Sequence, residues 1–209
     1  MNDLYKLNSD VSCCWSCKGP VIKHALFCPT CDVIQPPSDI DHFVRLGICR
    51  CYVLDLSELD RQYFHFQRLL HPDKFVCHTS KEQILSQAQV TVLNEAYETL
   101  KNPLKRAYYL LRLSGCVDID LITKTTNSDL LMEIMEIHEL LNDADTVDEI
   151  KVIEDQINAK MILCETSLEK AFVKENLDIA VELTTRLKYF KKLFEESSSR
   201  KIYITGINI

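Results

Sequence analysis

Apolar residues recur every three or four positions along most of the chain after residue 41, which is the period of an α-helix. The pattern predicts a short helix over 41–48, a longer helix from Ser57, its expected N-cap, to Leu70, and a third helix capped by Ser80. The apolar stripes of the two longer helices comprise Leu59, Tyr63, Phe66 and Leu70 in the first and Leu85, Ala88, Val92, Ala96 and Leu100 in the second. These two helices are expected to pack against each other in antiparallel directions.

A fourth helix is expected to begin at Asn102-Pro103, because asparagine caps helices and proline suits the first helical position. Its apolar face comprises Leu104, Ala107, Tyr108 and Leu111. Ser114-Gly115 is expected to end it. A polar stretch over 117–129 then separates this helix from the rest of the chain.

Three longer helical patterns follow the polar stretch. The first covers about Asp129 to Leu141, and the second begins at Thr146 and Glu149, which have the spacing of a capping box. The apolar positions of the second and third patterns are Val147, Ile150, Ile157, Met161, Cys164 and Leu168, and then Ile179, Leu183, Leu187, Phe190 and Phe194. Three antiparallel helices joined by short loops can close a core, so a three-helix bundle is predicted over 126–200.

The first part of the chain shows little helical periodicity and holds two C-x-x-C pairs, Cys14-x-x-Cys17 and Cys28-x-x-Cys31, before a proline pair that is typical of a linker. Zinc prefers four soft ligands in a tetrahedron, and two such turns can supply them. We therefore expect one structural zinc ion per chain, in a zinc-ribbon-like module over 12–37. A pair of disulfides or a redox C-x-x-C is the alternative interpretation.

The remaining cysteines are expected to be small core or surface residues rather than ligands: Cys49, Cys51, Cys77, Cys116 and Cys164. Cys13, next to the first pair, leaves the ligand register ambiguous, although the two-residue spacing favours Cys14.

The start of the chain has neither an apolar signal core nor an Arg-rich transit pattern. This favours the cytosol or a removed targeting segment. The ten cysteines are fewer than a disulfide scaffold of this length would hold, which favours a reducing compartment.

The charge balance limits the classes of partner. With 31 acidic and 24 basic side chains the net charge is −7, which argues against a nucleic-acid backbone as the main partner. No apolar run reaches the roughly 18 residues needed to span a bilayer, so no membrane-spanning segment is expected. Any surface that attracts acidic partners must therefore be a local basic patch.

One short sequence, "RLLHPDKF" over 68–75, interrupts the helical pattern. Because proline disfavours helix in the residue before it, His71, Pro72 and Asp73 are predicted to form an exposed loop. Pro72 stiffens this loop, and Asp73 offers a carboxylate suited to bidentate pairing with an arginine. The basic side chains nearby are Arg61, His65, Arg68 and Lys74, which suit an acidic partner surface. The alternative is an ordinary helix–helix turn with a solvated charged face.

Two antiparallel helices around a His-Pro-Asp loop, with a short helix before them and a proline-started helix after them, resemble the J-domain of DnaJ-type co-chaperones. The resemblance implies a J-domain over 39–114. In that family the loop docks on a DnaK-class ATPase chaperone and speeds its ATP hydrolysis. The residues then expected to bind the chaperone are His71, Pro72, Asp73, Lys74, Arg68, Arg61 and His65.

The stretch "SDLLMEIMEIHELLND" carries more apolar residues than one buried helix face needs. Leu130, Ile134, Ile137 and Leu141 cluster on one side of a helix. Leu131, Met132, Met135, Glu136 and Glu139 cluster on nearly the opposite side. If the first set fills the bundle core, the second set is a candidate partner-binding patch. The alternative is that this second set is buried against the J-like domain.

The order of a cysteine module, a J-domain and a three-helix bundle is similar to the HscB (Jac) family of iron–sulfur cluster co-chaperones, in its eukaryotic zinc-bearing branch. The segments "NEAYETLKNPLKRAYYLLRLSG" and "LMEIMEI" also resemble that family. Members deliver an IscU-type scaffold to a dedicated chaperone, and eukaryotic members are mitochondrial. By matched position, the resemblance implies scaffold binding by Leu131, Met132, Met135, Glu136, Glu139 and Tyr189.

The resulting interpretation is a mainly helical, non-enzymatic adaptor that needs no cofactor beyond zinc. A J-protein with other clients is one rival, and it predicts no binding to a cluster scaffold. An enzyme that uses Cys77 near His71 and His78 is another rival, which rests on proximity in sequence alone. Zinc-dependent nucleic-acid binding is a third, and whether the chain forms a homodimer is left open.

Overall fold

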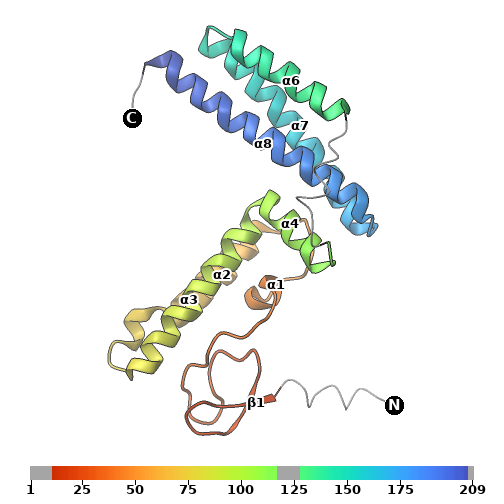
Figure 1. Ribbon diagram of the computed structural model, residues 1–209. Helices are drawn as coiled ribbons and strands as arrows, with labels where there is room; N and C mark the ends of the chain where they lie inside the picture. Colours follow the sequence, from red (N-terminus) through yellow and green to blue (C-terminus); the bar gives the residue numbers. More distant parts are fainter. Residues whose placement is uncertain (1–10, 117–127, 207–209) are drawn as a thin grey trace. The chain divides into compact units, whose positions relative to one another are not determined.

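The computed structural model describes residues 11–116 and 128–206, and it is mainly helical, as predicted (Figure 1). The chain divides into two compact units. The first comprises the chain up to Arg50 together with Leu54–Lys101, and the second comprises Cys51–Val53 and the chain from Asn102 onwards. Most of the polar stretch predicted over 117–129 lies outside the described residues. The three-domain division proposed from the sequence stays a prediction.

The first unit begins with a small module of two short strands and two cysteine turns. Strand β1 (Val11–Cys13) pairs antiparallel with β2 (Pro20–Ile22). Its buried apolar cluster comprises Cys14, Val21 and Cys28, with Ala25, Cys31 and Val33 packed against them. So small an apolar core cannot hold the module together by hydrophobic burial alone.

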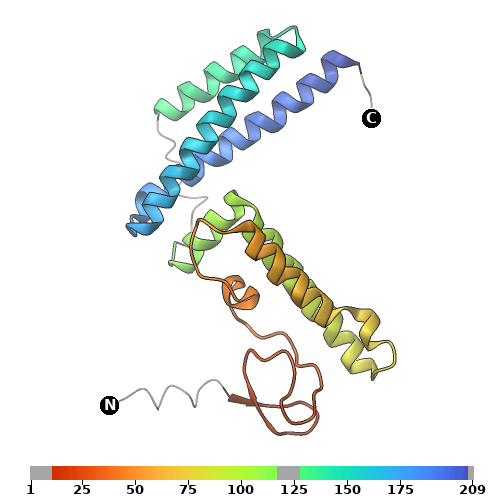
Figure 2. The same ribbon diagram turned by 180° about the vertical axis from the view of Figure 1, so that it is seen from behind.

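A helical hairpin follows the module (Figure 2). Helix α1 (His42–Leu46) leads to the two long helices α2 (Leu56–Leu70) and α3 (Ser80–Lys101), with a 3₁₀ turn, η1 (Pro72–Phe75), between them. Helices α2 and α3 run antiparallel side by side, as predicted. The hairpin thus presents the His-Pro-Asp sequence at the end where α2 stops.

The structure corrects the two predicted caps of the hairpin. Asp55, rather than Ser57, caps α2, because its carboxylate accepts hydrogen bonds from the N–H groups of Ser57 and Glu58. At the start of α3, the Thr79 hydroxyl accepts a hydrogen bond from the N–H of Glu82, and the N–H of Thr79 donates one to the Glu82 carboxylate. The cap therefore lies one residue before Ser80. Both errors place the cap too late by one or two residues.

The buried face of α3 is also rotated from its predicted position. Ala96 and Leu100 are buried as expected, but Leu85, Ala88 and Val92 are only half-buried. Their place is taken by Leu93 and by polar residues, among them Ser86 and Gln89. The Ser86 hydroxyl donates to the Leu70 carbonyl (2.6 Å) and the Gln89 amide donates to the Gln35 carbonyl (2.9 Å). Polar side chains can occupy this face because each has a hydrogen-bond partner.

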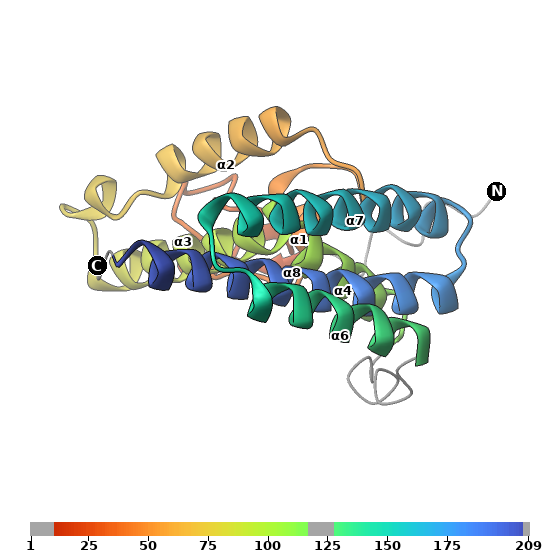
Figure 3. The ribbon, with the colours of Figure 1, turned by 90° about the horizontal axis from the view of Figure 1, so that it is seen from above.

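The second unit contains four helices in the described residues, α4 (Pro103–Leu113), α6 (Ser128–Asp143), α7 (Val147–Val173) and α8 (Leu177–Thr205). The predicted caps are confirmed here. The Asn102 side chain accepts from the first turn of α4, and Thr146 and Glu149 form a capping box at α7. Helices α6 and α8 run in the same direction and α7 runs against both, with α4 packed on α8 (Figure 3).

The bundle is held by apolar stripes and by one polar clamp. On α6 the buried residues are Leu130, Ile134, Ile137 and Leu141, as predicted. Glu133 of the same helix accepts from Lys160 of α7 (2.5 Å) and from Arg186 of α8 (2.6 Å). One carboxylate therefore links all three helices of the bundle. Within the described ranges, no helix combines the length and the apolar character that crossing a membrane requires.

Candidate metal centre and docking surfaces

The two cysteine pairs lie in tight turns of the same shape. In each turn, the residue four positions after the first cysteine has a positive φ, 63° for Lys18 and 57° for Asp32. The N–H of that residue donates to the carbonyl of the first cysteine, at 3.1 Å for Cys14 and 2.9 Å for Cys28. This left-handed step reverses the chain and turns both sulfurs of a pair toward one point.

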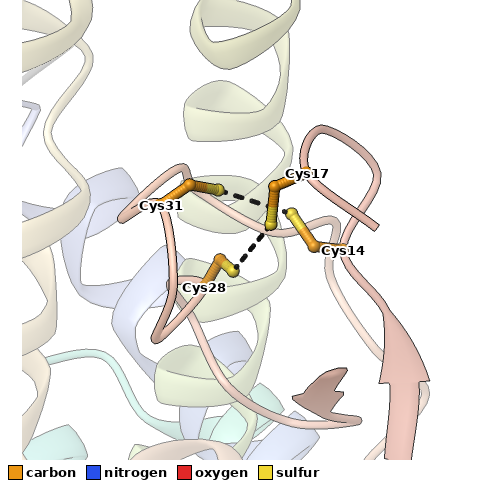
Figure 4. Close-up of side chains that lie close together, drawn as sticks. All are labelled: Cys14, Cys17, Cys28 and Cys31. Atoms are coloured by element: carbon orange, nitrogen blue, oxygen red, sulfur yellow. Dashed lines mark hydrogen bonds between the residues drawn. The ribbon is translucent and has the colours of Figure 1, made fainter. Parts of the chain in front are cut away.

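The four sulfurs converge from the two turns (Figure 4). The Sγ atoms of Cys14 and Cys31 are 3.7 Å apart, as are those of Cys17 and Cys28, and all four lie within 4.8 Å of one another. A tetrahedral ion with metal–sulfur bonds of about 2.3 Å needs sulfurs about 3.8 Å apart, whereas a disulfide needs about 2 Å. All four cysteines are free thiols, so the predicted ligand register is the one that the fold brings together.

Hydrogen-bond donors around the sulfurs favour thiolates. Burial raises the pKa of the Cys14 thiol, but the N–H groups of Cys17 and Ser16 and the Gln35 amide outweigh burial and bring its pKa to about 6. The N–H of Val33 favours the thiolate of Cys31, yet burial and the neighbouring sulfurs raise its pKa to about 12. Four thiolates this close need a cation to offset their charge, so the cluster suits a divalent metal ion.

Gln35 is a residue of this centre that sequence analysis missed. Its side-chain amide donates to the Cys14 sulfur (3.4 Å) and to the Val33 carbonyl (2.9 Å). The backbone carbonyl of Gln35 accepts a hydrogen bond from the side-chain amide of Gln89 on α3, and both glutamines are buried. Trp15 adds a second contact with α3, since the Lys81 ammonium lies 4.1 Å from the centre of its ring. The cysteine module is thereby attached to the helical hairpin.

The His-Pro-Asp sequence forms the exposed loop that was predicted. The N–H of Asp73 donates to Nδ1 of His71 (3.3 Å), and Pro72 starts the 3₁₀ turn. Phe75 is buried and anchors the end of this turn in the hairpin core. The Asp73 side chain is 85% exposed, and Nδ1 of the His71 ring lies 3.5 Å from its Oδ2. The loop is therefore fixed in shape while its carboxylate points to solvent.

The basic residues around the loop lie on the solvent side of α2 and η1. Arg61, His65, Arg68 and Lys74 are all exposed. Arg61 pairs with Glu58 one turn earlier, so part of its charge is compensated on its own helix. A groove of about 640 Å³ lies beside Arg68 and Lys74, and its lining includes Phe64, an aromatic that sequence analysis did not single out.

The second apolar stripe of α6 is exposed. Leu131, Met132 and Met135 expose 46%, 54% and 60% of their surface. Glu136 and Glu139 on the same side are exposed as well. The side of α6 opposite the core therefore presents large apolar side chains next to two carboxylates.

Tyr189 lies on α8 and is half-buried. It follows Arg186 by almost one helical turn, and Arg186 bonds to Glu133 of α6. The role of Tyr189 in binding a scaffold stays a prediction.

His78, one of the two histidines of the enzymatic alternative, contacts a carboxylate of the helix that follows it. Nδ1 of His78 is 3.0 Å from the Glu82 carboxylate, which also accepts from the Thr79 hydroxyl (2.7 Å). The imidazole is thus part of the N-terminal cap of α3. Cys77 is exposed beside it.

Residues 126–197 match the family model described as the HSCB C-terminal oligomerisation domain. The human iron–sulfur cluster co-chaperone protein HscB is 33% identical over 193 residues, which cover 90% of this chain and 82% of the human protein. The Arabidopsis thaliana homolog of that protein is 33% identical over 184 residues, with coverages of 88% and 72%. The co-chaperone protein HscB of Proteus mirabilis is 32% identical over 171 residues, with coverages of 75% and 93%.

Solved structures agree with these relatives. The crystal structure of the human co-chaperone protein HscB superposes with a TM-score of 0.84 at 32% identity, over 92% of this chain and 100% of that one. The Jac1 co-chaperone of Saccharomyces cerevisiae superposes with a TM-score of 0.61 at 26% identity, over 72% and 86% of the two chains.

Proposed function

Since the chain belongs to the HscB family of iron–sulfur cluster co-chaperones, we propose that it binds an IscU-type scaffold protein, delivers it to a DnaK-class chaperone and stimulates the ATPase of that chaperone. The protein acts as an adaptor and catalyses no reaction itself. Its J-domain, over 39–114, contacts the chaperone, and its C-terminal bundle, over 126–200, contacts the scaffold.

The exposure of Asp73 is the observation that carries the chaperone half of this proposal. A carboxylate that is 85% exposed at the tip of a hydrogen-bonded loop can pair bidentately with an arginine of a partner. Because the loop is already fixed by His71 and Pro72, little conformational entropy is lost on binding. The basic residues Arg61, His65, Arg68 and Lys74 then face an acidic surface of the chaperone.

The exposed stripe of α6 supports the scaffold half. Leu131, Met132 and Met135 supply adaptable apolar contacts, and Tyr189 extends the surface onto α8. The carboxylates of Glu136 and Glu139 border these side chains and favour a basic edge on the scaffold. The iron–sulfur cluster is cargo of the scaffold and needs no ligand from this chain.

Zinc is the metal that best fits the cysteine centre, because it takes four thiolates in a closed tetrahedron. Cys14, Cys17, Cys28 and Cys31 would hold it, and it would supply the link between two turns that share a very small core. With four protein ligands no position stays open for a substrate, so the role is structural. For a eukaryotic-type member, the mitochondrial matrix is the compartment we propose.

An ATPase assay of a DnaK-class chaperone, run with and without an IscU-type scaffold, tests the proposal. We expect this protein to raise the rate of ATP hydrolysis and the scaffold to raise it further. Asp73→Asn should abolish the stimulation, because the amide cannot accept an arginine bidentately as an anion does, while helical circular dichroism stays unchanged. Glu95→Gln, at an exposed carboxylate of α3, is the matched control and should retain full activity.

Two results would contradict this function. Full stimulation by Asp73→Asn would remove the loop from the mechanism. The second result has two parts: the scaffold leaves the stimulated rate of ATP hydrolysis unchanged, and a calorimetric titration with the scaffold gives no heat of binding. Together they would indicate a J-protein with other clients.

A further inference from the structure

An exposed aromatic side chain lies in the middle of the cationic face of α2. Phe64 exposes 56% of its surface, and its ring lies 5.3 Å from the neighbouring Tyr63 ring at a tilted angle of 60°. It lines the groove of about 640 Å³ next to the loop. The complete lining comprises Phe64, Gln67, Arg68, His71 and Lys74.

The polar walls of this groove are held in place by the hairpin itself. Gln67 donates to the Tyr63 hydroxyl (2.9 Å) and to the Asn94 side chain of α3 (2.9 Å). Arg68 donates from Nε to the backbone carbonyl of Phe64 (3.2 Å), which leaves its terminal nitrogens toward solvent. A partner that enters the groove therefore meets side chains that are already ordered, and little entropy is lost there.

The charge of the groove selects the partner chemistry. Arg68 and Lys74 are cationic, and among the described residues no carboxylate lines the groove. The floor supplied by Phe64 is apolar. An acidic segment that also carries an apolar side chain matches both features, whereas a nucleic-acid backbone would be repelled by the net charge of −7.

We propose that Phe64 is the apolar anchor of the chaperone-docking surface, and that the groove takes up an apolar side chain from an acidic segment of the DnaK-class chaperone. This inference rests on the proposed function, and it adds a contact to the Asp73 loop and the basic patch. The two contacts have separable roles. Asp73 acts in stimulation itself, whereas Phe64 supplies affinity because aromatic side chains in desolvated pockets dominate interface energetics.

Titration of the chaperone ATPase with increasing co-chaperone separates these roles. For Phe64→Ala we expect about a tenfold rise in the concentration needed for half-maximal stimulation, with the maximal rate retained. Ile84→Ala is the control, because Ile84 is 64% exposed on α3 and does not line the groove. Both variants should keep the wild-type melting temperature, since neither side chain is core.

Ionic strength distinguishes an apolar anchor from an electrostatic one. The loss caused by Arg68→Gln should shrink as salt is added, because exposed charges are screened, whereas the loss caused by Phe64→Ala should persist. Equal salt dependence of the two variants would mean that Phe64 only orients Arg68, and would overturn the inference.

The remaining outcomes are equally decisive. An unchanged half-maximal concentration for Phe64→Ala, with Asp73→Asn inactive, would refute the anchor and leave the proposed function standing. An absence of stimulation by the wild-type protein would refute both.

Discussion

The cysteine module and the C-terminal bundle keep their folds by different means. In the module, a small buried cluster and a set of N–H···S bonds hold the four sulfurs, and no long apolar stripe is present in residues 11–37. In the bundle, three helices bury stripes such as Ile150, Ile153 and Ile157 along their whole length. We therefore expect the module to depend on a bound ion, whereas the bundle depends on many side chains that each contribute a little.

This difference determines which surface each region can offer. Because the bundle core is satisfied by one side of α6, the other side is free to expose Leu131, Met132 and Met135 without cost to folding. The module exposes a smaller apolar pair, Val11 and Ile22 on its two strands, and its buried polar groups attach it to α3 through Gln35 and Gln89. The bundle is suited to binding and the module to holding a neighbour in place.

Removal of two metal ligands is expected to have the largest effect on the fold of the module. We expect elemental analysis to find one zinc ion per chain in the wild type, and Cys28→Ser together with Cys31→Ser should eliminate it, because two thiolates cannot hold the ion. The module should then unfold while the helices remain, since structural zinc contributes on the order of 10 kcal/mol to folding such segments. Trp15, the single tryptophan of the chain, reports on this by fluorescence.

Cys13→Ser is the matched control, because Cys13 is exposed on β1 and its sulfur is outside the cluster. It should retain one zinc and the wild-type fluorescence of Trp15. A wild-type protein that is native without metal would end the idea that the module depends on an ion.

The two sides of α6 provide the second contrast. Ile137→Ala on the buried side should lower the free energy of unfolding by about 2–5 kcal/mol, because it leaves a cavity in the bundle. The triple change of Leu131, Met132 and Met135 to Ala should lower it by about 1 kcal/mol or less, yet weaken scaffold binding at least tenfold by calorimetry. A large fall in the melting temperature of the triple variant would instead make its side chains core.

Sequence reasoning succeeded where the determinant is local. The two cysteine spacings, the caps at Asn102 and Thr146, and the division of α6 into two sides all depend on residues within a few positions of one another. These features follow from helical geometry and from the reach of a C-x-x-C turn. The prediction of Ser57 as a cap failed because Asp55 stands two residues earlier and its carboxylate reaches the same N–H groups.

The features that sequence reasoning missed depend on contacts between distant residues. Gln89 is buried on α3 because the Gln35 carbonyl, far away along the chain, accepts its hydrogen bond. Periodicity alone therefore assigned that face to Leu85 and Val92. Phe64 stands between Tyr63 and Phe66, and its exposure becomes apparent only when the orientation of α2 against α3 is known.

Removal of the polar clamp, in which Glu133 accepts from Lys160 and Arg186, is expected to have a moderate effect on the stability of the bundle. Glu133→Gln removes the charge that pairs with Lys160 and Arg186, and these side chains are partly shielded from water. We expect the free energy of unfolding in urea to fall by about 2 kcal/mol, because hydrogen bonds to charged groups contribute about 1.5–3 kcal/mol each and partial exposure reduces this. Glu136→Gln, exposed on the same helix, should change stability by less than about 0.5 kcal/mol. Equal stabilities of the two variants would show that the apolar stripes alone hold the bundle.

The smallest expected effect concerns the attachment of the module to the hairpin. Gln89→Leu keeps the size of the buried side chain but leaves the Gln35 carbonyl without its donor, which should cost about 1 kcal/mol. Hydrogen exchange should then quicken in residues 11–37 while α2 and α3 keep their protection, because the helices pack independently of this bond. Gln87→Leu, on the exposed side of α3, should leave exchange unchanged. If exchange in the module stays slow in Gln89→Leu, the metal centre holds its own structure and the buried amide pair merely fills space between two independent regions.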